Sequence, residues 1–311
     1  MIYTVTLNPA VDRELTVPSM EWDTLLRSSQ QRTDVGGKGF NVSRMVQRLG
    51  GKSVALGFVG GNAGKLLEDG MQQHGVATDF IWVSEESRIN VSVVMAGGGR
   101  YFKVNERGPK IAPTEQAALI DKVLSLATPD DWCVLCGSLP PNVPDGIYAN
   151  LITQLQMKGT RVVLDTSGEA LRLGCAALPY LVTPNSSEAI ELTKEFNLSV
   201  AAKLIYQSGP SHVVVTLGQN GAMLVDAQGV QVVTPPTVVE QNAIGAGDAL
   251  VGGLVYSLEQ GLSLDEALRW GVACGTVASR LEGTAFGDRA TVRCMLSQLI
   301  SGNSPDAPRI E

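Results

Sequence analysis

The feature that most constrains the fold is a regular alternation of short apolar runs with longer amphipathic stretches. The apolar runs predict strands at residues 2–7, 53–59, 79–83, 132–136, 161–165, 180–183 and 212–216. Helical periodicity predicts helices at residues 40–49, 63–73, 114–126, 145–157 and 246–259. Strands that alternate with helices build a mostly parallel sheet covered by helices. We therefore predict an α/β fold, whose ligands bind beyond the carboxyl ends of the strands.

Two stretches interrupt this alternation and predict a second, smaller sheet. Residues 89–95 and 100–104 flank three glycines and are typical of a β-hairpin, while residues 11–33 are polar and strand-like. We expect residues 11–33 and 88–105 to form a β-sheet lid. The core would then comprise residues 1–10, 34–87 and 106–311. A further hairpin is predicted within the core, from residues 221–225 and 231–233, and the tail from Ser301 is expected to be frayed.

Composition excludes several classes of partner. The chain has 311 residues, of which 44% are hydrophobic, so it can bury a large core. Its net charge of −7 argues against nucleic acid as a partner. No apolar run approaches the ~20 residues of a membrane span, and residues 1–7 are typical of a strand rather than a signal peptide. We expect a cytoplasmic protein without a membrane partner.

Cysteine and histidine offer little catalytic chemistry. Cys133 and Cys136 form a C-x-x-C pair, but within a strand such residues point to opposite faces, so we predict two buried thiols rather than a redox pair. The only histidines are His74 and His212. A histidine-based metal site or a Ser-His-Asp triad is therefore not expected.

The most suggestive motif for catalysis runs from Ile244 to Asp248. Gly245, Ala246 and Gly247 precede an apolar helical stretch, so their backbone N–H groups can line an anion site at a helix start. Asp248 at that site can take a proton from an attacking hydroxyl. Acidic residues also favour the first turn of helices for purely electrostatic reasons, and this alternative remains open.

Two other motifs allow both a functional and a structural interpretation. Gly36, Gly37, Lys38 and Asn41 precede or begin a predicted helix, which suits a phosphorylated or polyhydroxy ligand but also a glycine turn that starts a helix. Asn185 and Glu188 are three residues apart at another helix start, where they can organise a hydrated Mg²⁺ or form a capping box. The glycines between residues 57 and 64 lack the G-x-G-x-x-G spacing of a dinucleotide site.

Taken together, the ordered segments resemble the ribokinase-like (PfkB) carbohydrate kinases. The segments are TLNPAVD (6–12), GGKGFNV (36–42), CGSLPP (136–141), DTSG (165–168), PNSSE (184–188) and IGAGD (244–248), and they span nearly the whole chain. The opening segment with GGKG is most similar to 1-phosphofructokinases and tagatose-6-phosphate kinases. The resemblance implies a ribokinase-like fold.

The resemblance also implies the role of each site residue. Asp248 would be the catalytic base, with the amides of Gly245, Ala246 and Gly247 holding the charge of the transferring group. Asp12, Gly37 and Asn41 would contact sugar hydroxyls. The phosphate of the substrate would be held by Lys38, Arg88, Arg27 and Ser138. Asn185 and Glu188 would organise Mg²⁺ and the ATP phosphates, and Thr216, Gly218 and Gly247 would line the nucleotide site.

The implied activity is ATP- and Mg²⁺-dependent phosphorylation of a ketohexose monophosphate. Fructose 1-phosphate is the expected substrate, with tagatose 6-phosphate and fructose 6-phosphate as alternatives. A nucleotide-binding oxidoreductase and a catalytically silent sugar-phosphate sensor are the alternatives from other classes. The resemblance further implies a homodimer formed through the β-lid. Ala243, Ala249 and Thr183 depart from the family's usual residues.

Overall fold

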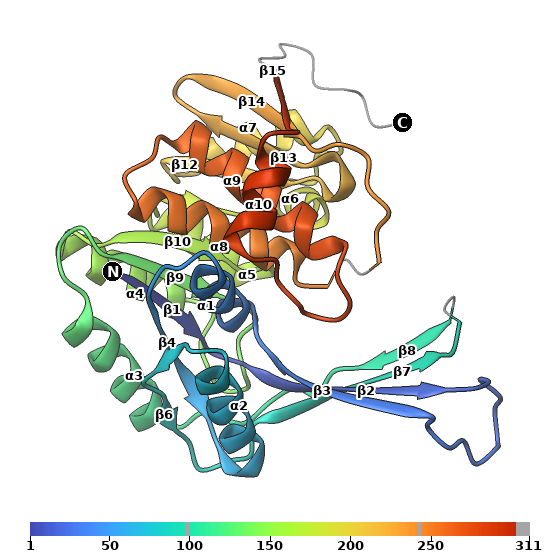
Figure 1. Cartoon of the computed structure of the whole chain (residues 1–311). Helices are drawn as coiled ribbons and strands as arrows, with labels where there is room; N and C mark the ends of the chain where they lie inside the picture. The colour runs from blue at the N-terminus through green and yellow to red at the C-terminus, as the bar shows by residue number, and fades with distance from the viewer. Residues whose placement is uncertain (98–99, 242–243, 303–311) are drawn as a thin grey trace.

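A computed structural model describes residues 1–97, 100–241 and 244–302, and its centre is one large sheet (Figure 1). Neighbouring strands follow the order β15-β14-β13-β12-β11-β10-β9-β1-β4-β5, with β6 paired to β4. The strands are β1 (Ile2–Thr6), β4 (Ser53–Val59), β5 (Ala77–Thr78), β6 (Ile81–Trp82), β9 (Trp132–Cys136), β10 (Arg161–Asp165), β11 (Leu181–Val182), β12 (His212–Thr216), β13 (Ala222–Asp226), β14 (Gly229–Thr234) and β15 (Ile300–Gly302).

The sheet is parallel from β5 through β12 and antiparallel from β12 to β15. The mostly parallel sheet and the hairpin of β13 and β14 are therefore confirmed. The strand predicted at 79–83 is instead two short strands, β5 and β6, on either side of a break. The expected fraying is wrong for Ser301, which pairs with Val233 in β15, and residues 303–311 lie outside the described part of the chain.

Helices cover both faces of the sheet. They are α1 (Lys38–Arg48), α2 (Gly61–Gln73), α3 (Pro113–Leu126), α4 (Ile147–Met157), α5 (Gly168–Ala176), α6 (Ser186–Thr193), α7 (Leu198–Gln207), α8 (Ala246–Glu259), α9 (Leu264–Ser279) and α10 (Arg289–Leu296), with a 3₁₀ turn η1 at Gly218–Asn220. The sequence did not predict α5, α7, α9 and α10, and of α6 it predicted only the start, at Asn185. Most are too short to show several turns of periodicity, and α9 is buried almost all round, which weakens its polar face.

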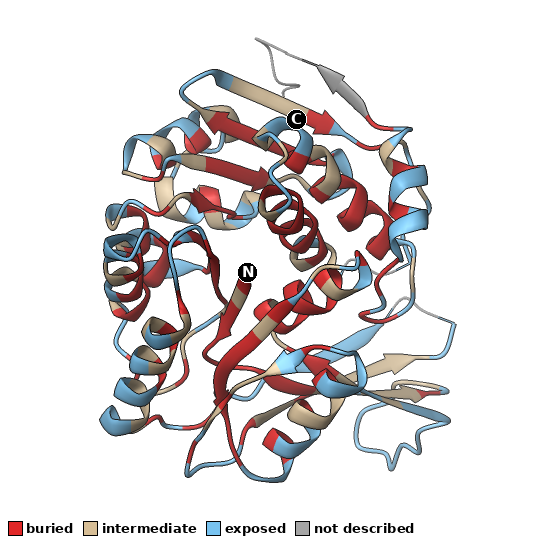
Figure 2. Ribbon diagram, turned by 60° about the vertical axis from the view of Figure 1, so that its left-hand side comes forward, coloured by how far each residue is buried: buried red, intermediate tan, exposed pale blue. Residues whose placement is uncertain are grey.

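Two apolar clusters occupy the two faces of the large sheet (Figure 2). One contains residues of α1, α8, α9 and α10, and the other contains residues of α3, α4, α5 and α7. Cys136 belongs to the first cluster and Cys133 to the second, and both are free and buried. Burial raises the pKa of the Cys133 thiol to about 12. The prediction of two buried, unreactive thiols on opposite faces is confirmed.

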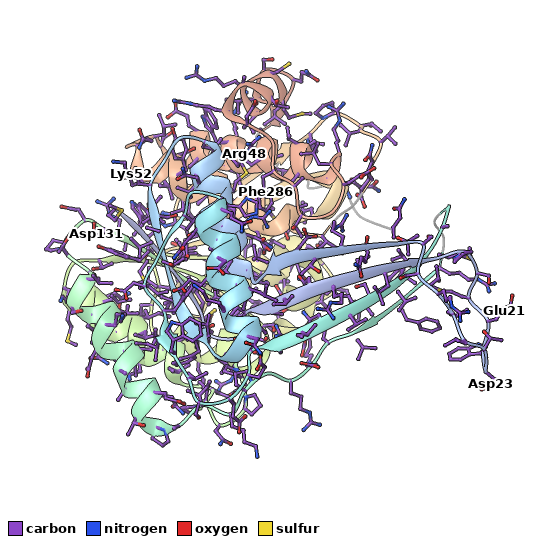
Figure 3. The ribbon with its side chains drawn as sticks, turned by 60° about the horizontal axis from the view of Figure 1, so that its bottom comes forward. Glu21, Asp23, Arg48, Lys52, Asp131 and Phe286 are labelled. Carbon is purple, nitrogen blue, oxygen red and sulfur yellow. The ribbon has the colours of Figure 1, made fainter. Side chains whose placement is uncertain are left out.

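A second sheet of four strands projects away from this core (Figure 1). Its strands lie in the order β3-β2-β7-β8 and comprise β2 (Ala10–Val17), β3 (Gln30–Gly36), β7 (Arg88–Met95) and β8 (Tyr101–Val104). The connection between β2 and β3 forms the far tip, where Figure 3 labels Glu21 and Asp23. The α/β class with a second small sheet is thus confirmed, and the division of the chain into core and lid remains a proposal.

Candidate active site

The expected anion site lies at the N-terminus of α8, where the structure places the predicted helix start. Gly245 precedes the helix with a φ of 79°, a left-handed conformation that costs glycine little, and Ala246, Gly247 and Asp248 form the first turn. Asp248 is partly exposed, and its Oδ2 accepts a hydrogen bond of 2.8 Å from Nδ2 of Asn41. A carboxylate therefore stands beside the outward-pointing N–H groups of a helix start.

Lys38 connects three segments that are far apart in the sequence. Its Nζ lies 2.7 Å from Oδ1 of Asp165 and 3.8 Å from Oε1 of Glu188. Lys38 begins α1, Asp165 ends β10, and Glu188 belongs to α6. Because parallel strands end at the same edge of the sheet, the chain brings these charges together at the edge where ligands bind.

The charges of this cluster shift one another's pKa values. Burial and the nearby carboxylate of Asp165 raise the pKa of Asp248 to about 6, although Lys38 and the hydrogen bond from Asn41 oppose the shift. Burial alone would lower the pKa of Lys38, but Asp165, Asp248 and Glu188 outweigh it and raise that pKa. Lys38 therefore stays cationic, while Asp248 is a stronger base than an ordinary aspartate and still ionises near neutral pH.

Asn185 and Glu188 form a reciprocal capping box. Oδ1 of Asn185 accepts from the backbone N–H of Glu188 at 2.9 Å, and the N–H of Asn185 donates to Oε2 of Glu188 at 2.8 Å. Of the two interpretations of this motif, the capping box is therefore present in the structure. Glu188 still directs Oε1 toward Lys38, so the capping role does not consume the whole carboxylate.

No ready-made metal site is present in the part of the chain that the structure describes. Among those residues, no group of three or more His, Cys, Asp or Glu side chains is arranged to hold a metal ion. The acidic side chains of Asp165, Glu188 and Asp248 nevertheless gather around Lys38. Oxygen atoms of this kind suit Mg²⁺, which keeps several waters and shares its coordination with substrate phosphates.

The base of the second sheet supplies the expected sugar-binding groups. Oδ1 of Asp12 on β2 accepts a hydrogen bond of 2.8 Å from Nδ2 of Asn90 on β7. The other carboxylate oxygen of Asp12, Oδ2, lies over Gly36. A Cβ added at position 36 would come within 2.2 Å of this oxygen. Glycine at position 36 therefore makes room for the Asp12 carboxylate, which lies close to the start of α1 and Gly37.

Arg88 is anchored by backbone carbonyls and lies near Ser138. Its Nε and Nη2 both donate to the carbonyl of Asn8, at 3.2 and 2.9 Å, and Nη1 donates to the carbonyl of Glu106 at 3.1 Å. The Nδ2 of Asn8 in turn lies 3.5 Å from Oγ of Ser138. Three of the five N–H donors of the guanidinium are thus used, which leaves two for a ligand.

Two expected phosphate ligands lie away from Arg88. Lys38 pairs with Asp165 and Glu188 at the start of α1, so the structure does not bring it together with Arg88. Arg27 is exposed in the connection between β2 and β3, at the far end of the projecting sheet. Within one chain, the structure therefore places Lys38 and Arg27 apart from Arg88 and Ser138. The sequence does not reveal this separation, because it depends on how distant segments pair and on how far the second sheet projects from the core.

A pocket of about 430 Å³ adjoins the start of α8. Thr216, Gly218, Ala246 and Gly247 line it, together with apolar groups that include Pro236, Val238 and Val272. Thr216 also forms a β-bridge with Asn185, which places the pocket next to the capping box. The pocket places apolar groups beside the N-terminus of α8, an arrangement that suits an adenine nucleotide. Ala249 is buried in α8, and Ala243 lies outside the described residues.

Three functional residues carried no individual prediction. Asp165 and Asn8 lie within segments that resemble the family, and the position of Asp165 at the end of a strand is a signal that could have singled it out. Arg44 is buried, donates from Nη1 to Oδ1 of Asn41 at 3.1 Å, and packs over the ring of Phe286. Periodicity alone places Arg44 on α1 and gives no sign of this bridge between Asn41 and the segment near residue 284.

Comparison with known proteins agrees with this geometry. The family described as pfkB family carbohydrate kinase matches residues 6–290 of this chain. A 1-phosphofructokinase of Bacillus subtilis (strain 168) is 34% identical over 305 residues, covering 96% of this chain and 97% of its own length. A D-tagatose-1-phosphate kinase of Bacillus licheniformis is 32% identical over 306 residues, covering 96% and 98%. The structure of phosphofructokinase-2 from Escherichia coli in complex with substrates and products is 32% identical, with a TM-score of 0.89 and coverage of 95% and 98%.

The expected ribokinase-like class is confirmed by these similarities in sequence and fold. Within residues 1–97, 100–241 and 244–302, no helix combines the length and the apolar character needed to cross a membrane.

Proposed function

Because the chain belongs to the pfkB family of carbohydrate kinases, we propose that it transfers a phosphoryl group from ATP to the C6 hydroxyl of fructose 1-phosphate. The observation that carries this proposal is Asp248 at the anion site of α8, with its pKa raised to about 6. Tagatose 6-phosphate and fructose 6-phosphate remain alternative acceptors of the phosphoryl group. The family membership favours a kinase over the oxidoreductase, and a base poised to ionise favours an enzyme over a silent sensor.

The proposed step divides the work among residues of this chain. Asp248 accepts the proton of the attacking sugar hydroxyl as the bond from oxygen to phosphorus forms and the bond to the leaving ADP breaks. The N–H groups of Gly245, Ala246 and Gly247 hold the charge on the transferring group. Asn41 holds the carboxylate of Asp248 in place through its 2.8 Å hydrogen bond.

We assign Lys38 to the transferring group instead of the substrate's own phosphate. Its contacts with Asp165 and Glu188 and its electrostatic interaction with Asp248 support this revision. Asp165, Asn185 and Glu188 would organise Mg²⁺ with the phosphates of ATP, and Thr216, Gly218 and Gly247 would line the nucleotide site. When bound, Mg²⁺ neutralises charge on the phosphates.

Arg88 and Ser138 are the proposed contacts of the phosphate that the substrate already carries. The guanidinium has two N–H donors left for it, and its anchoring by Asn8 and Glu106 fixes its orientation. Asp12, Gly37 and Asn41 remain the proposed contacts of the sugar hydroxyls. Arg27 can contribute only if a second copy of the chain brings it to this site.

A homodimer through the second sheet is part of the proposal. Trp22, Leu25 and Tyr101 are 80%, 79% and 72% exposed on this sheet and its loops, and the rings of Trp22 and Phe102 pack edge to face at 5.2 Å. Trp22, Tyr101 and Phe102 line a pocket of about 430 Å³. Large exposed apolar groups gathered in one place favour an interface between proteins, and a second copy would bury them.

A kinetic panel tests the substrate assignment. We expect kcat/KM with ATP and Mg²⁺ to be highest for fructose 1-phosphate, lower for fructose 6-phosphate and tagatose 6-phosphate, and far lower for unphosphorylated fructose. A higher kcat/KM for another ketohexose phosphate would reassign the substrate within the family. Equal kcat/KM values for fructose and fructose 1-phosphate would refute the role of Arg88 in holding a phosphate.

A further inference from the structure

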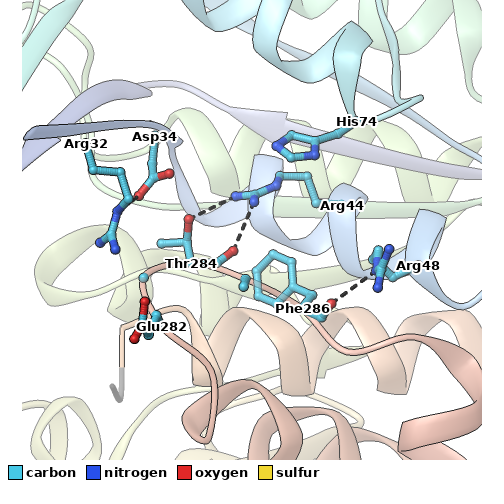
Figure 4. A pocket seen from close by; sticks show the side chains of 10 residues that line it. Arg32, Asp34, Arg44, Arg48, His74, Glu282, Thr284 and Phe286 are labelled. Carbon is cyan, nitrogen blue, oxygen red and sulfur yellow. Dashed lines mark hydrogen bonds and ion pairs between the residues drawn. The ribbon is translucent and has the colours of Figure 1, made fainter. Parts of the chain in front are cut away.

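A pocket of about 500 Å³ lies beside α1, outside the catalytic and nucleotide sites (Figure 4). It is bounded by the base of the second sheet, α1, the end of α2 and the segment 282–286. The residues that line it are Arg32, Asp34, Arg44, Arg48, His74, Glu282, Gly283, Thr284, Ala285 and Phe286. Its lining combines three arginines and a histidine with two acids, Asp34 and Glu282.

Arg44 is the best-defined element of the pocket. Its side chain is only 7% exposed, and its buried Nε has no hydrogen-bond partner. Its other nitrogens donate to neutral acceptors, namely Oδ1 of Asn41, Oγ1 of Thr284 and the carbonyl of Thr284. A buried donor without a partner costs free energy, so binding that shifts Arg44 enough to give Nε an acceptor would be favoured.

Arg48 is a second cation that forms no ion pair among the described residues, although the carboxylate of Asp288 interacts with it electrostatically. Its Nε donates to the carbonyl of Phe286 at 3.1 Å, and no ion pair holds its guanidinium. The acids of the pocket are placed differently. Asp34 is paired with Arg32 at 2.8 Å, and Glu282 lies near Arg32, at the end of the pocket away from Arg48 (Figure 4). Arg44 and Arg48 therefore carry the positive charge at this end of the pocket, while burial lowers the pKa of His74 and favours its neutral form. Asp34 also interacts electrostatically with Arg44.

We propose that this pocket binds a small dianion, a phosphate ester or a dicarboxylate, between Arg44 and Arg48. Guanidinium groups match the planar arrangement of such oxygens, and the volume admits a ligand of a few carbon atoms. His74 borders the same space and can donate to the ligand from its ring.

The same arginine connects the pocket to the active site. Arg44 donates to Asn41, and Asn41 donates to the carboxylate of Asp248 and is a proposed contact of the sugar. A dianion that binds Arg44 competes with its hydrogen bond to Asn41 and shifts its position, so it changes how Asn41 is held. Occupancy of the pocket therefore alters the affinity of the chain for its sugar substrate.

Calorimetric titration with malonate and with methyl phosphate tests the binding, and it needs no kinase activity. We expect saturable binding of at least one of them to the whole chain, and Arg48→Gln should weaken it by about tenfold or more. Arg172→Gln is the matched control, because it removes the same charge from an exposed pair with Glu169 on α5. Arg48→Lys, which keeps the charge, should recover part of the affinity. The stronger of the two ligands identifies the class of dianion.

Two results would overturn the proposal. Binding that is equal in Arg48→Gln and Arg172→Gln would place the anion elsewhere, including the active site, and an absence of saturable binding would remove the site altogether. For the connection to catalysis, the ligand should change the apparent affinity for the sugar phosphate about fivefold in the control but not in Arg48→Gln. An unchanged affinity in the control would refute that connection.

Discussion

Replacing Asp248 with asparagine should stabilise the fold at neutral pH while it removes the catalytic base. The pKa of this carboxyl rises from an ordinary 3.8 to about 6 in the folded chain. A difference of about 2 in pKa corresponds to about 3 kcal/mol of folding free energy that ionisation costs at pH 7. Asparagine keeps the shape of the side chain and avoids this cost.

Part of that gain will be offset. Asp248 is one of the three carboxylates that raise the pKa of Lys38, so its neutral replacement leaves this cation less well compensated. We therefore expect the free energy of unfolding at pH 7 to increase by about 1–2 kcal/mol. Turnover should fall by about 10²–10⁴-fold, the usual contribution of a general base.

The pH dependence identifies the cause of the gain. Because the folded chain holds this proton more tightly than the unfolded chain, the cost is absent below pH 3.8. It develops as the pH rises from 3.8 to about 6 and is complete above that range. The stability advantage of Asp248→Asn should therefore be present at pH 7 and nearly absent at pH 4.

Urea unfolding at both pH values and steady-state kinetics provide the measurement. Asp265→Asn is the matched control, because Asp265 is an exposed aspartate in the first turn of α9. It should lose a few tenths of a kcal/mol from the helix dipole and keep full activity. A variant at Asp248 that is less stable than the parent at pH 7, with turnover within tenfold of it, would refute both the raised pKa of Asp248 and its role as the base.

The other predictions concern the phosphates, the metal and the dimer. Arg88→Ala should weaken the apparent affinity for the sugar phosphate by about 10- to 150-fold, with an unchanged KM for ATP. If the variant still prefers fructose 1-phosphate to unphosphorylated fructose, the role of Arg88 is contradicted. Glu188→Gln should raise the Mg²⁺ concentration for half-maximal activity without changing sugar affinity, whereas lost stability with an unchanged Mg²⁺ titration would leave only the capping role. Trp22→Asp should shift sedimentation from dimer to monomer, while Phe196→Asp, at an 83% exposed side chain, should not; a dimer that persists would exclude the second sheet as the interface.

The local features of the site could be predicted from the sequence because they depend on neighbouring residues. Gly245 to Asp248 form a helix start whose geometry follows from glycine and the apolar run after it. The second sheet likewise follows from polar strands that interrupt the alternation. The spacing of Asn185 and Glu188 allowed two interpretations, and the structure realises the capping box without excluding the other.

Contacts between distant segments could not be predicted in this way. Lys38 meets Asp165 across 127 residues and Asn41 meets Asp248 across 207 residues, and only the order of the strands brings them together. The family resemblance grouped Arg27 with Arg88, yet Arg27 lies in an exposed connection at the opposite end of the second sheet. The bridge made by Arg44 depends on tertiary packing against Thr284 and Phe286.

The most direct test of the central proposal is ³¹P NMR of the chain incubated with fructose 1-phosphate, ATP and Mg²⁺. A second phosphate ester, at C6 of the sugar, should appear together with ADP and should be nearly absent with Asp248→Asn. If no bisphosphate forms from fructose 1-phosphate, fructose 6-phosphate or tagatose 6-phosphate while ATP remains intact, phosphoryl transfer to a ketohexose monophosphate is contradicted.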